Sequence, residues 1–106
     1  MKQFGTQKLG QNGNALVVRL PIEWLATHKV KLSDPLFSVL TLDDIIRVHL
    51  EKVDWSKSTG VREINNSPHL TIPQAFVDRL GLTKESVVSM ETDVQHQILL
   101  IRRVGR

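Results

Sequence analysis

The sequence of 106 residues contains no cysteine. This absence excludes a disulfide framework, a zinc site built on thiolates and a cysteine nucleophile. No apolar run approaches the roughly 18 residues that a membrane-spanning helix needs, and residues 1–5 lack the apolar core of a secretion signal. Two independent domains are also excluded, because a half of about 50 residues would bury too little surface to be stable alone. We therefore expect one soluble, cytoplasmic domain.

The patterns of common catalytic and cofactor sites are missing as well. The 4 histidines form no His-x-x-x-His pair on a helix face, and the glycine-containing segment 10–13 lacks the lysine-serine end of a phosphate-binding loop. Asp43-Asp44 is typical of a tight turn, and no further metal ligands accompany it. We therefore predict that the chain is not an enzyme and that it holds no metal and no cofactor.

Acidic residues are scarce in the first third of the chain. Over the whole sequence, 14 Lys and Arg against 11 Asp and Glu give a formal net charge of +3. Up to Ser33 the only acid is Glu23, whereas the basic residues there are Lys2, Lys8, Arg19, Lys29 and Lys31. Such a segment fits contact with phosphate, because cations near a polyanion release its counterions. A solvated charged surface explains the same excess, and charge alone favours that second interpretation.

Two segments, 13–25 and 65–77, share one order of signals. Aligning Pro21 with Pro73 gives an offset of 52 positions. Further matches are Asn14 with Asn66 and Trp24 with Phe76 at the same offset, Leu32 with Leu82 at 50, and Leu50 with Ile101 at 51. The drift predicts small length differences in the loops. The chain is therefore interpreted as a tandem duplication, and internal repeats of this kind govern the whole fold.

Each repeat has the same predicted order of strand, strand, short helix, strand and strand. Proline lacks an N–H and suits the first turn of a helix, so helices are predicted at 21–27 and 73–80, the second stopped by Gly81. Alternating polar and apolar residues predict the strands. These are 3–8, 15–20, 37–42 and 45–50 in the first repeat, and 60–65, 69–72, 87–92 and 97–102 in the second.

The polar segment 52–59 is predicted to be a linker. Repeat 1 then spans residues 1–51 and repeat 2 spans residues 60–106. A single repeat leaves sheet edges and an apolar face uncovered, whereas two repeats packed together bury both. We therefore predict one mainly-β domain with pseudo-two-fold symmetry, in which Trp24 and Phe76 occupy equivalent positions in the core.

Both repeats resemble the AbrB/MazE/SpoVT swapped-hairpin family. Leu70-Thr71-Ile72-Pro73-Gln74-Ala75-Phe76-Val77-Asp78-Arg79-Leu80-Gly81-Leu82 is close to the helix-bearing stretch of that family. Gly13-Asn14, the following strand and Arg19-Leu20-Pro21 resemble its MazE-like version, and Asn66-Ser67-Pro68 fits the same version in the second repeat. The resemblance covers nearly the whole chain, twice.

The resemblance implies a double-split, swapped-hairpin β-barrel in which hairpins of two copies interleave. It also implies a transcription regulator, often a repressor, that binds double-stranded DNA through a β-rich face near the N-terminal strands. Because two copies lie in one chain, the chain could form the barrel alone, while an intertwined homodimer of four repeats stays open. No membrane partner is expected.

In MazE-like proteins the basic residue two positions before the helix proline, and residues around the Gly-Asn turn, face DNA. Arg19 holds that basic position, and its guanidinium can bind a phosphate or a guanine edge with two hydrogen bonds. Thr71 holds the same position in the second repeat, which puts a symmetric DNA face in doubt. The predicted DNA-binding residues are Lys8, Gln11, Asn12, Asn14, Arg19, Arg62, Asn65 and Asn66. For the asparagines, turn formation is the competing explanation.

Two other functions compete with DNA regulation. The first is an antitoxin or another protein-interaction module. Antitoxins of this type carry a long C-terminal tail that wraps the toxin, and only residues 103–106 follow the last predicted strand, so a toxin partner is not favoured. The second is a duplicate that assembles but has lost DNA binding, which Thr71 and Glu63 motivate.

Overall fold

A computed structural model describes residues 1–105; Arg106, the last residue of the predicted second repeat, lies outside the described residues. The described chain is mainly β, as predicted, with short helices. In chain order its elements are β1 (Gln3–Lys8), β2 (Gly10–Asn12), β3 (Ala15–Arg19), α1 (Ile22–Thr27), β4 (Pro35–Leu40), β5 (Ile45–His49), β6 (Lys57–Gly60), β7 (Arg62–Ile64), β8 (Ser67–Thr71), α2 (Gln74–Leu80), β9 (Val87–Thr92) and β10 (Leu99–Arg103).

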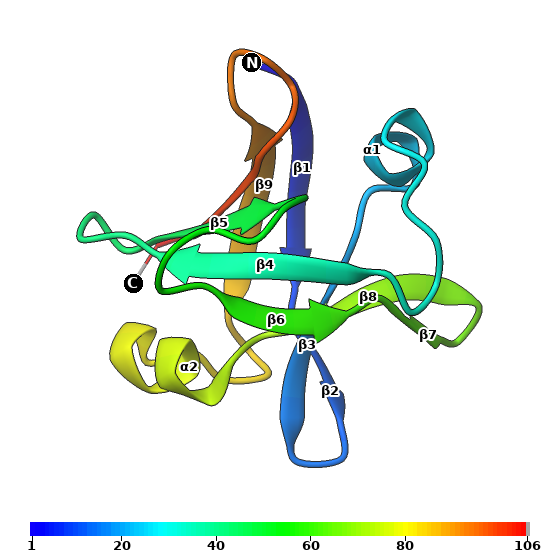
Figure 1. Cartoon of the computed structure of the whole chain (residues 1–106). Coiled ribbons are helices and arrows are strands. Elements are labelled where there is room, and N and C mark those ends of the chain that lie inside the picture. Colours follow the sequence, from blue (N-terminus) through cyan, green and yellow to red (C-terminus); the bar gives the residue numbers. More distant parts are fainter. Residues whose placement is uncertain (106) are drawn as a thin grey trace.

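The strands form two sheets, and both sheets mix strands of the two repeats (Figure 1). The larger sheet has the order β1-β9-β10-β5-β4-β6, and the smaller sheet has the order β2-β3-β8-β7. At each edge of the larger sheet, a strand of one repeat pairs with the other repeat: β1 with β9, and β6 with β4. The larger sheet curls, so that β1 and β9 run across the direction of β4 and β6 (Figure 1).

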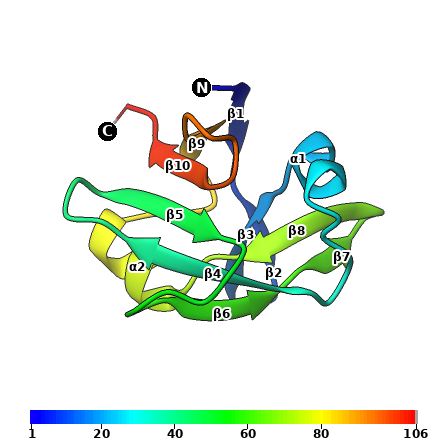
Figure 2. The same cartoon turned by 45° about the horizontal axis from the view of Figure 1, so that its top comes forward.

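Backbone hydrogen bonds recur in the two halves at an offset of 52. The N–H of Leu9 donates to Ser86 O, and the N–H of Val61 donates to Asp34 O, each at 3.0 Å. The strand pairing in the two hairpins follows the same offset, because Gly10 lies opposite Val17 in one and Arg62 lies opposite His69 in the other. The helices occupy matching places on opposite sides of the molecule (Figure 2).

The predicted drift of the offset to 50 and 51 is wrong. The N–H of Val30 donates to Leu25 O, and the N–H of Leu82 donates to Val77 O, so Leu82 matches Val30 and not Leu32. The offset stays at 52 until the last hairpin. There the turn closes from Asp93 to Ile98 in the second half, one residue longer than its counterpart from Thr41 to Ile45.

That extra residue sets the offset of the last strands to 53. Val39 lies opposite Arg47 in one hairpin, and Glu91 lies opposite Leu100 in the other. Ile101 therefore matches Val48 and not Leu50. Similar leucine-containing pairs near the true matches suggested the drift, whereas the one inserted residue lies in the turn of the last hairpin.

Within residues 1–105, each half has five strands rather than the predicted four. The strand predicted at 60–65 is divided by the buried Val61 into β6 and β7, and β6 begins at Lys57, inside the predicted linker 52–59. In the first half, the buried Leu9 likewise separates β1 from β2, which was not predicted. Both β2 and β6 are short and polar, so they lack the apolar alternation that marks a strand in sequence.

The two predicted helices and the predicted core positions of Trp24 and Phe76 are confirmed. Pro21 and Pro73 precede the helices as their N-cap residues, so each helix begins one position after its predicted start. Gly81 ends α2 with φ +64°, a left-handed conformation that glycine adopts without strain. Trp24 and Phe76 are both buried in one hydrophobic core. The longer helix has 7 residues, and no helix in residues 1–105 has the length and apolar character needed to cross a membrane.

Candidate nucleic-acid interface

Three nitrogen-bearing side chains form a row across the smaller sheet. In the strand pairing, Arg19 of β3 lies opposite His69 of β8, and His69 lies opposite Arg62 of β7. Residues directly opposite each other in antiparallel strands share a face, with Cβ atoms about 4.5–5.5 Å apart. Arg19 and Arg62 are exposed, and His69 is half-buried. We call these three residues the basic row.

The basic row lies on the face of the sheet that is turned away from the core. Val18 and Leu70 are the neighbours of Arg19 and His69 along their strands, so their side chains point to the other face. Both are almost completely buried and belong to the hydrophobic core. Strand alternation thus turns one face of the sheet to the core and leaves the two arginines on the other face, where Val17 is also buried.

The backbone of Arg19 is held by the side chain of Gln7. Gln7 Oε1 accepts a hydrogen bond from the N–H of Arg19 at 2.8 Å, and Gln7 Nε2 donates to Arg19 O at 2.9 Å. The pairing of β2 with β3 reaches only to Gly10 and Val17, so the amide of Gln7 takes the place of a strand residue beside Arg19. Arg19 is thereby fixed without use of its guanidinium.

The side chains of the basic row keep free hydrogen-bonding groups. Neither Arg19 nor Arg62 makes an ion pair with another residue in the described range 1–105. His69 Nδ1 lies 2.9 Å from Ser67 O. Since a carbonyl oxygen can only accept, Nδ1 carries the proton, and Nε2 is the nitrogen that remains for a ligand.

The remaining predicted residues do not form one cluster with Arg19. The β2–β3 turn and the β7–β8 turn lie at opposite ends of the smaller sheet, because β3 and β8 run antiparallel. Arg19 is the last residue of β3, so it lies at the same end of the sheet as the β7–β8 turn. One group is therefore Arg19, Arg62, Asn65 and Asn66, and the other is Gln11, Asn12 and Asn14.

The backbone conformation of the two turns accounts for the residue types at some of their positions. Asn65 and Asn66 both have positive φ, +52° and +65°, as a two-residue type I′ hairpin turn requires. In the other turn Gly13 has φ +64° and Asn14 does not share that conformation. The backbone therefore accounts for asparagine at 65 and 66, and DNA contact by these side chains stays a prediction.

Lys8 and Gln11 stand apart from the basic row. Lys8 belongs to β1 in the larger sheet, and its Nζ lies 3.2 Å from Glu85 Oε1, so part of its charge is balanced. Gln11 lies opposite Leu16, on the face of the smaller sheet that carries Val18. His69 was not predicted as a site residue, because only the pairing of β3 with β8 places it between two arginines.

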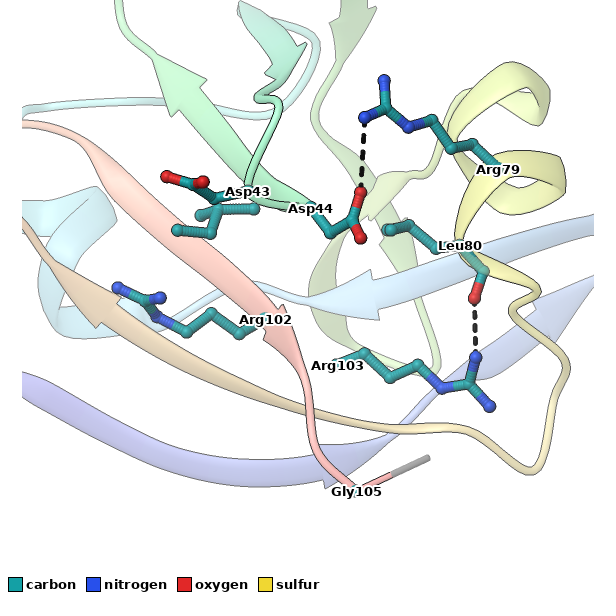
Figure 3. A pocket seen from close by; sticks show the side chains of 8 residues that line it. Asp43, Asp44, Arg79, Leu80, Arg102, Arg103 and Gly105 are labelled. Carbon is teal, nitrogen blue, oxygen red and sulfur yellow. Dashed lines mark hydrogen bonds and ion pairs between the residues drawn. The ribbon is translucent and has the colours of Figure 1, made fainter.

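A second group of arginines lines a cleft of about 430 Å³ beside α2 (Figure 3). Here Arg79 Nη2 lies 3.4 Å from Asp44 Oδ1, and Arg103 Nη1 donates to Leu80 O at 2.6 Å. Asp43 also lines the cleft. Because the guanidinium groups of Arg79 and Arg103 already have acceptors within the chain, and two carboxylates also line the cleft, it suits a polyanion less well than the basic row does.

Residues 1–105 contain no group of three histidine, aspartate or glutamate side chains that could hold a metal ion. Comparisons of the chain with protein-family models, with curated proteins and with solved structures find no match. The geometry of the basic row and the resemblance of the two repeats are therefore the grounds on which a function is inferred.

Proposed function

We propose that the chain is a cytoplasmic transcription regulator, acting as a repressor, that binds double-stranded DNA with the face of its smaller sheet that carries Arg19, His69 and Arg62. The basic row of Arg19, His69 and Arg62 carries this proposal. It extends over two interstrand spacings, about 10 Å. Side chains spread over that distance can reach more than one phosphate, and β-sheets are known to enter DNA grooves.

The finer architecture that we propose is the swapped-hairpin barrel of the AbrB/MazE/SpoVT family. Its support is the exchange at the sheet edges, where β1 lies against the second half and β6 against the first. In that arrangement the two repeats of one chain take the place of two subunits. The smaller sheet, which holds the basic row, then contains one hairpin from each repeat.

The roles within the interface follow from the chemistry of each group. A guanidinium can pair with a phosphate or with the O6 and N7 atoms of guanine. His69 Nε2 can accept from a base or, in the protonated imidazole, donate to a phosphate. Because the net charge is only +3, long-range attraction is modest, and affinity depends on these local contacts.

The test begins with selection of bound duplexes from a random pool at two salt concentrations. Fluorescence anisotropy on the selected duplex then compares the wild-type chain with Arg19→Ala and Arg62→Ala. Each variant is expected to lose about 1–3 kcal/mol of binding free energy, and loss of a phosphate contact also reduces the salt slope by about 1. The matched control is Arg102→Ala, an exposed arginine on β10 outside the row. Unchanged affinity in both row variants would overturn the proposed interface.

A further inference from the structure

An apolar groove of about 380 Å³ lies between α1 with its following loop and the β7–β8 hairpin. Ile22, Ala26 and Leu32 line one wall, and Val61 and Pro68 line the other. Ile22 is 70% exposed and Leu32 is 50% exposed. Large apolar side chains gathered around a concave surface are typical of a protein interaction site.

The second half of the molecule shows that the fold does not need these apolar residues. At the offset of 52, the positions of Ile22, Ala26 and Leu32 correspond to Gln74, Asp78 and Lys84. All three counterparts are polar and exposed, and Gln74 Nε2 donates to Asp78 Oδ1 at 2.8 Å. The apolar surface on α1 is therefore a property of the first half alone, added to a scaffold that is equally compatible with polar groups.

Opposite charges lie on the two walls of the groove. Lys31 is on the wall formed by α1 and its loop, and Glu63 is on the wall formed by the hairpin. Both are exposed, and neither forms an ion pair with another residue between 1 and 105. In a two-fold contact every pair of contacting residues occurs twice. Lys31 of each copy can therefore face Glu63 of the other.

We propose that this groove is the interface of a homodimer, with a second copy of the chain as its occupant. Ile22 and Leu32 of each copy then enter the groove of the other, and two Lys31–Glu63 contacts flank the apolar centre. Because the same surface is used by both copies, the contact closes and does not propagate into a filament. The fraction of dimer then depends on the concentration of the chain.

The dimer leaves the basic row uncovered. Glu63 and Arg62 are neighbours on β7, so they lie on opposite faces of the smaller sheet. Each dimer would present two basic rows. The interface itself is inferred from the groove and stands whether or not the chain binds DNA.

The apolar part of the interface is tested by giving the first half the residues of the second. In sedimentation equilibrium, the mass of the wild-type chain should rise with concentration toward that of two chains. The variant Ile22→Gln/Ala26→Asp/Leu32→Lys should dimerise roughly tenfold or more weakly. Leu42→Gln is the control, because Leu42 is 90% exposed outside the groove. Circular dichroism verifies that each variant is folded.

The contacts between Lys31 and Glu63 are tested by exchanging the two charges. Lys31→Glu and Glu63→Lys should each weaken the dimer, because like charges then meet, and the double variant should restore it. A wild-type chain that stays monomeric at all concentrations overturns the proposal; such a chain would leave the groove to a different protein. A dimer that both the triple variant and the single charge reversals leave intact overturns it as well, since another surface would then hold the copies together.

Discussion

Val18 and Leu70 lie directly opposite each other at the centre of the smaller sheet, and they hold equivalent positions in the two repeats. The offset of 52 that relates them also relates the two hairpins that flank them. An approximate two-fold axis of the chain therefore passes between these side chains. Both are almost fully buried, so the contact between the repeats is also the centre of the core.

This position gives a prediction for stability. Leu70→Ala removes a fully buried side chain and should lower the free energy of unfolding by about 2–5 kcal/mol. Since both sheets contain strands of both halves, unfolding in urea should remain a single transition. Leu42→Ala, at an exposed turn, should change stability by less than about 0.5 kcal/mol. A Leu70→Ala loss as small as that of the control would contradict the central place given to this contact.

The approximate symmetry does not extend to the charges. The axis relates Arg19 to Thr71, and it relates His69 to Val17. Arg62 corresponds to Gly10. The basic row therefore has an uncharged counterpart, Gly10-Val17-Thr71, on the same sheet. The basic residues of the first third of the sequence belong to the first half, but the row takes only Arg19 from that half and its other two members from the second.

Much of the fold was predictable because its signals are local. Pro21, Pro73 and Gly81 mark helix ends by their own backbone restrictions, and the burial of Trp24 and Phe76 follows from helical spacing. The polar strands β2 and β6 could not be found this way, because their place depends on backbone pairing with distant segments.

The candidate site was less predictable than the fold for the same reason. Arg19 and Arg62 were both named, but no local pattern shows that one histidine lies between them. That arrangement depends on pairing between β3 and β8, whose partners are about 50 positions apart along the chain. His69 by itself carries no motif, so its relation to the arginines is visible only in the folded chain.

The turn between β9 and β10 gives a prediction for pH. Asp93 Oδ1 accepts hydrogen bonds from the N–H groups of Gln97 at 2.8 Å and Ile98 at 3.1 Å. Burial acts to raise the pKa of Asp93, but these backbone donors, together with the N–H of Asp93 itself and the positive charge of Arg47, outweigh it and hold the pKa below its ordinary value of 3.8. The ionised carboxylate therefore stabilises the folded chain above about pH 4, and this stabilisation is lost as the pH falls through the lowered value.

Asp93→Ala should accordingly lower the free energy of unfolding by about 1–2 kcal/mol at pH 7. The difference from the wild-type chain should shrink below pH 3.8, where the unfolded chain and then the folded chain take up the proton. Urea unfolding at a series of pH values measures it, with the exposed Asp54→Ala as the matched control. A difference that does not change with pH would show that the charge of Asp93 contributes nothing to this turn.

The β7–β8 turn separates a backbone role from a DNA contact. Glycine adopts the positive φ of Asn65 and Asn66 without strain, so Asn65→Gly/Asn66→Gly should keep the hairpin and its register, whereas Asn65→Ala/Asn66→Ala should destabilise it by about 1–2 kcal/mol per residue. The turn adjoins the basic row, and loss of both amides should weaken DNA binding by about 1 kcal/mol, roughly fivefold. Anisotropy titrations of the folded glycine variant measure this loss. If that variant binds DNA with wild-type affinity, Asn65 and Asn66 serve only to form the turn, and the interface is confined to Arg19, His69 and Arg62.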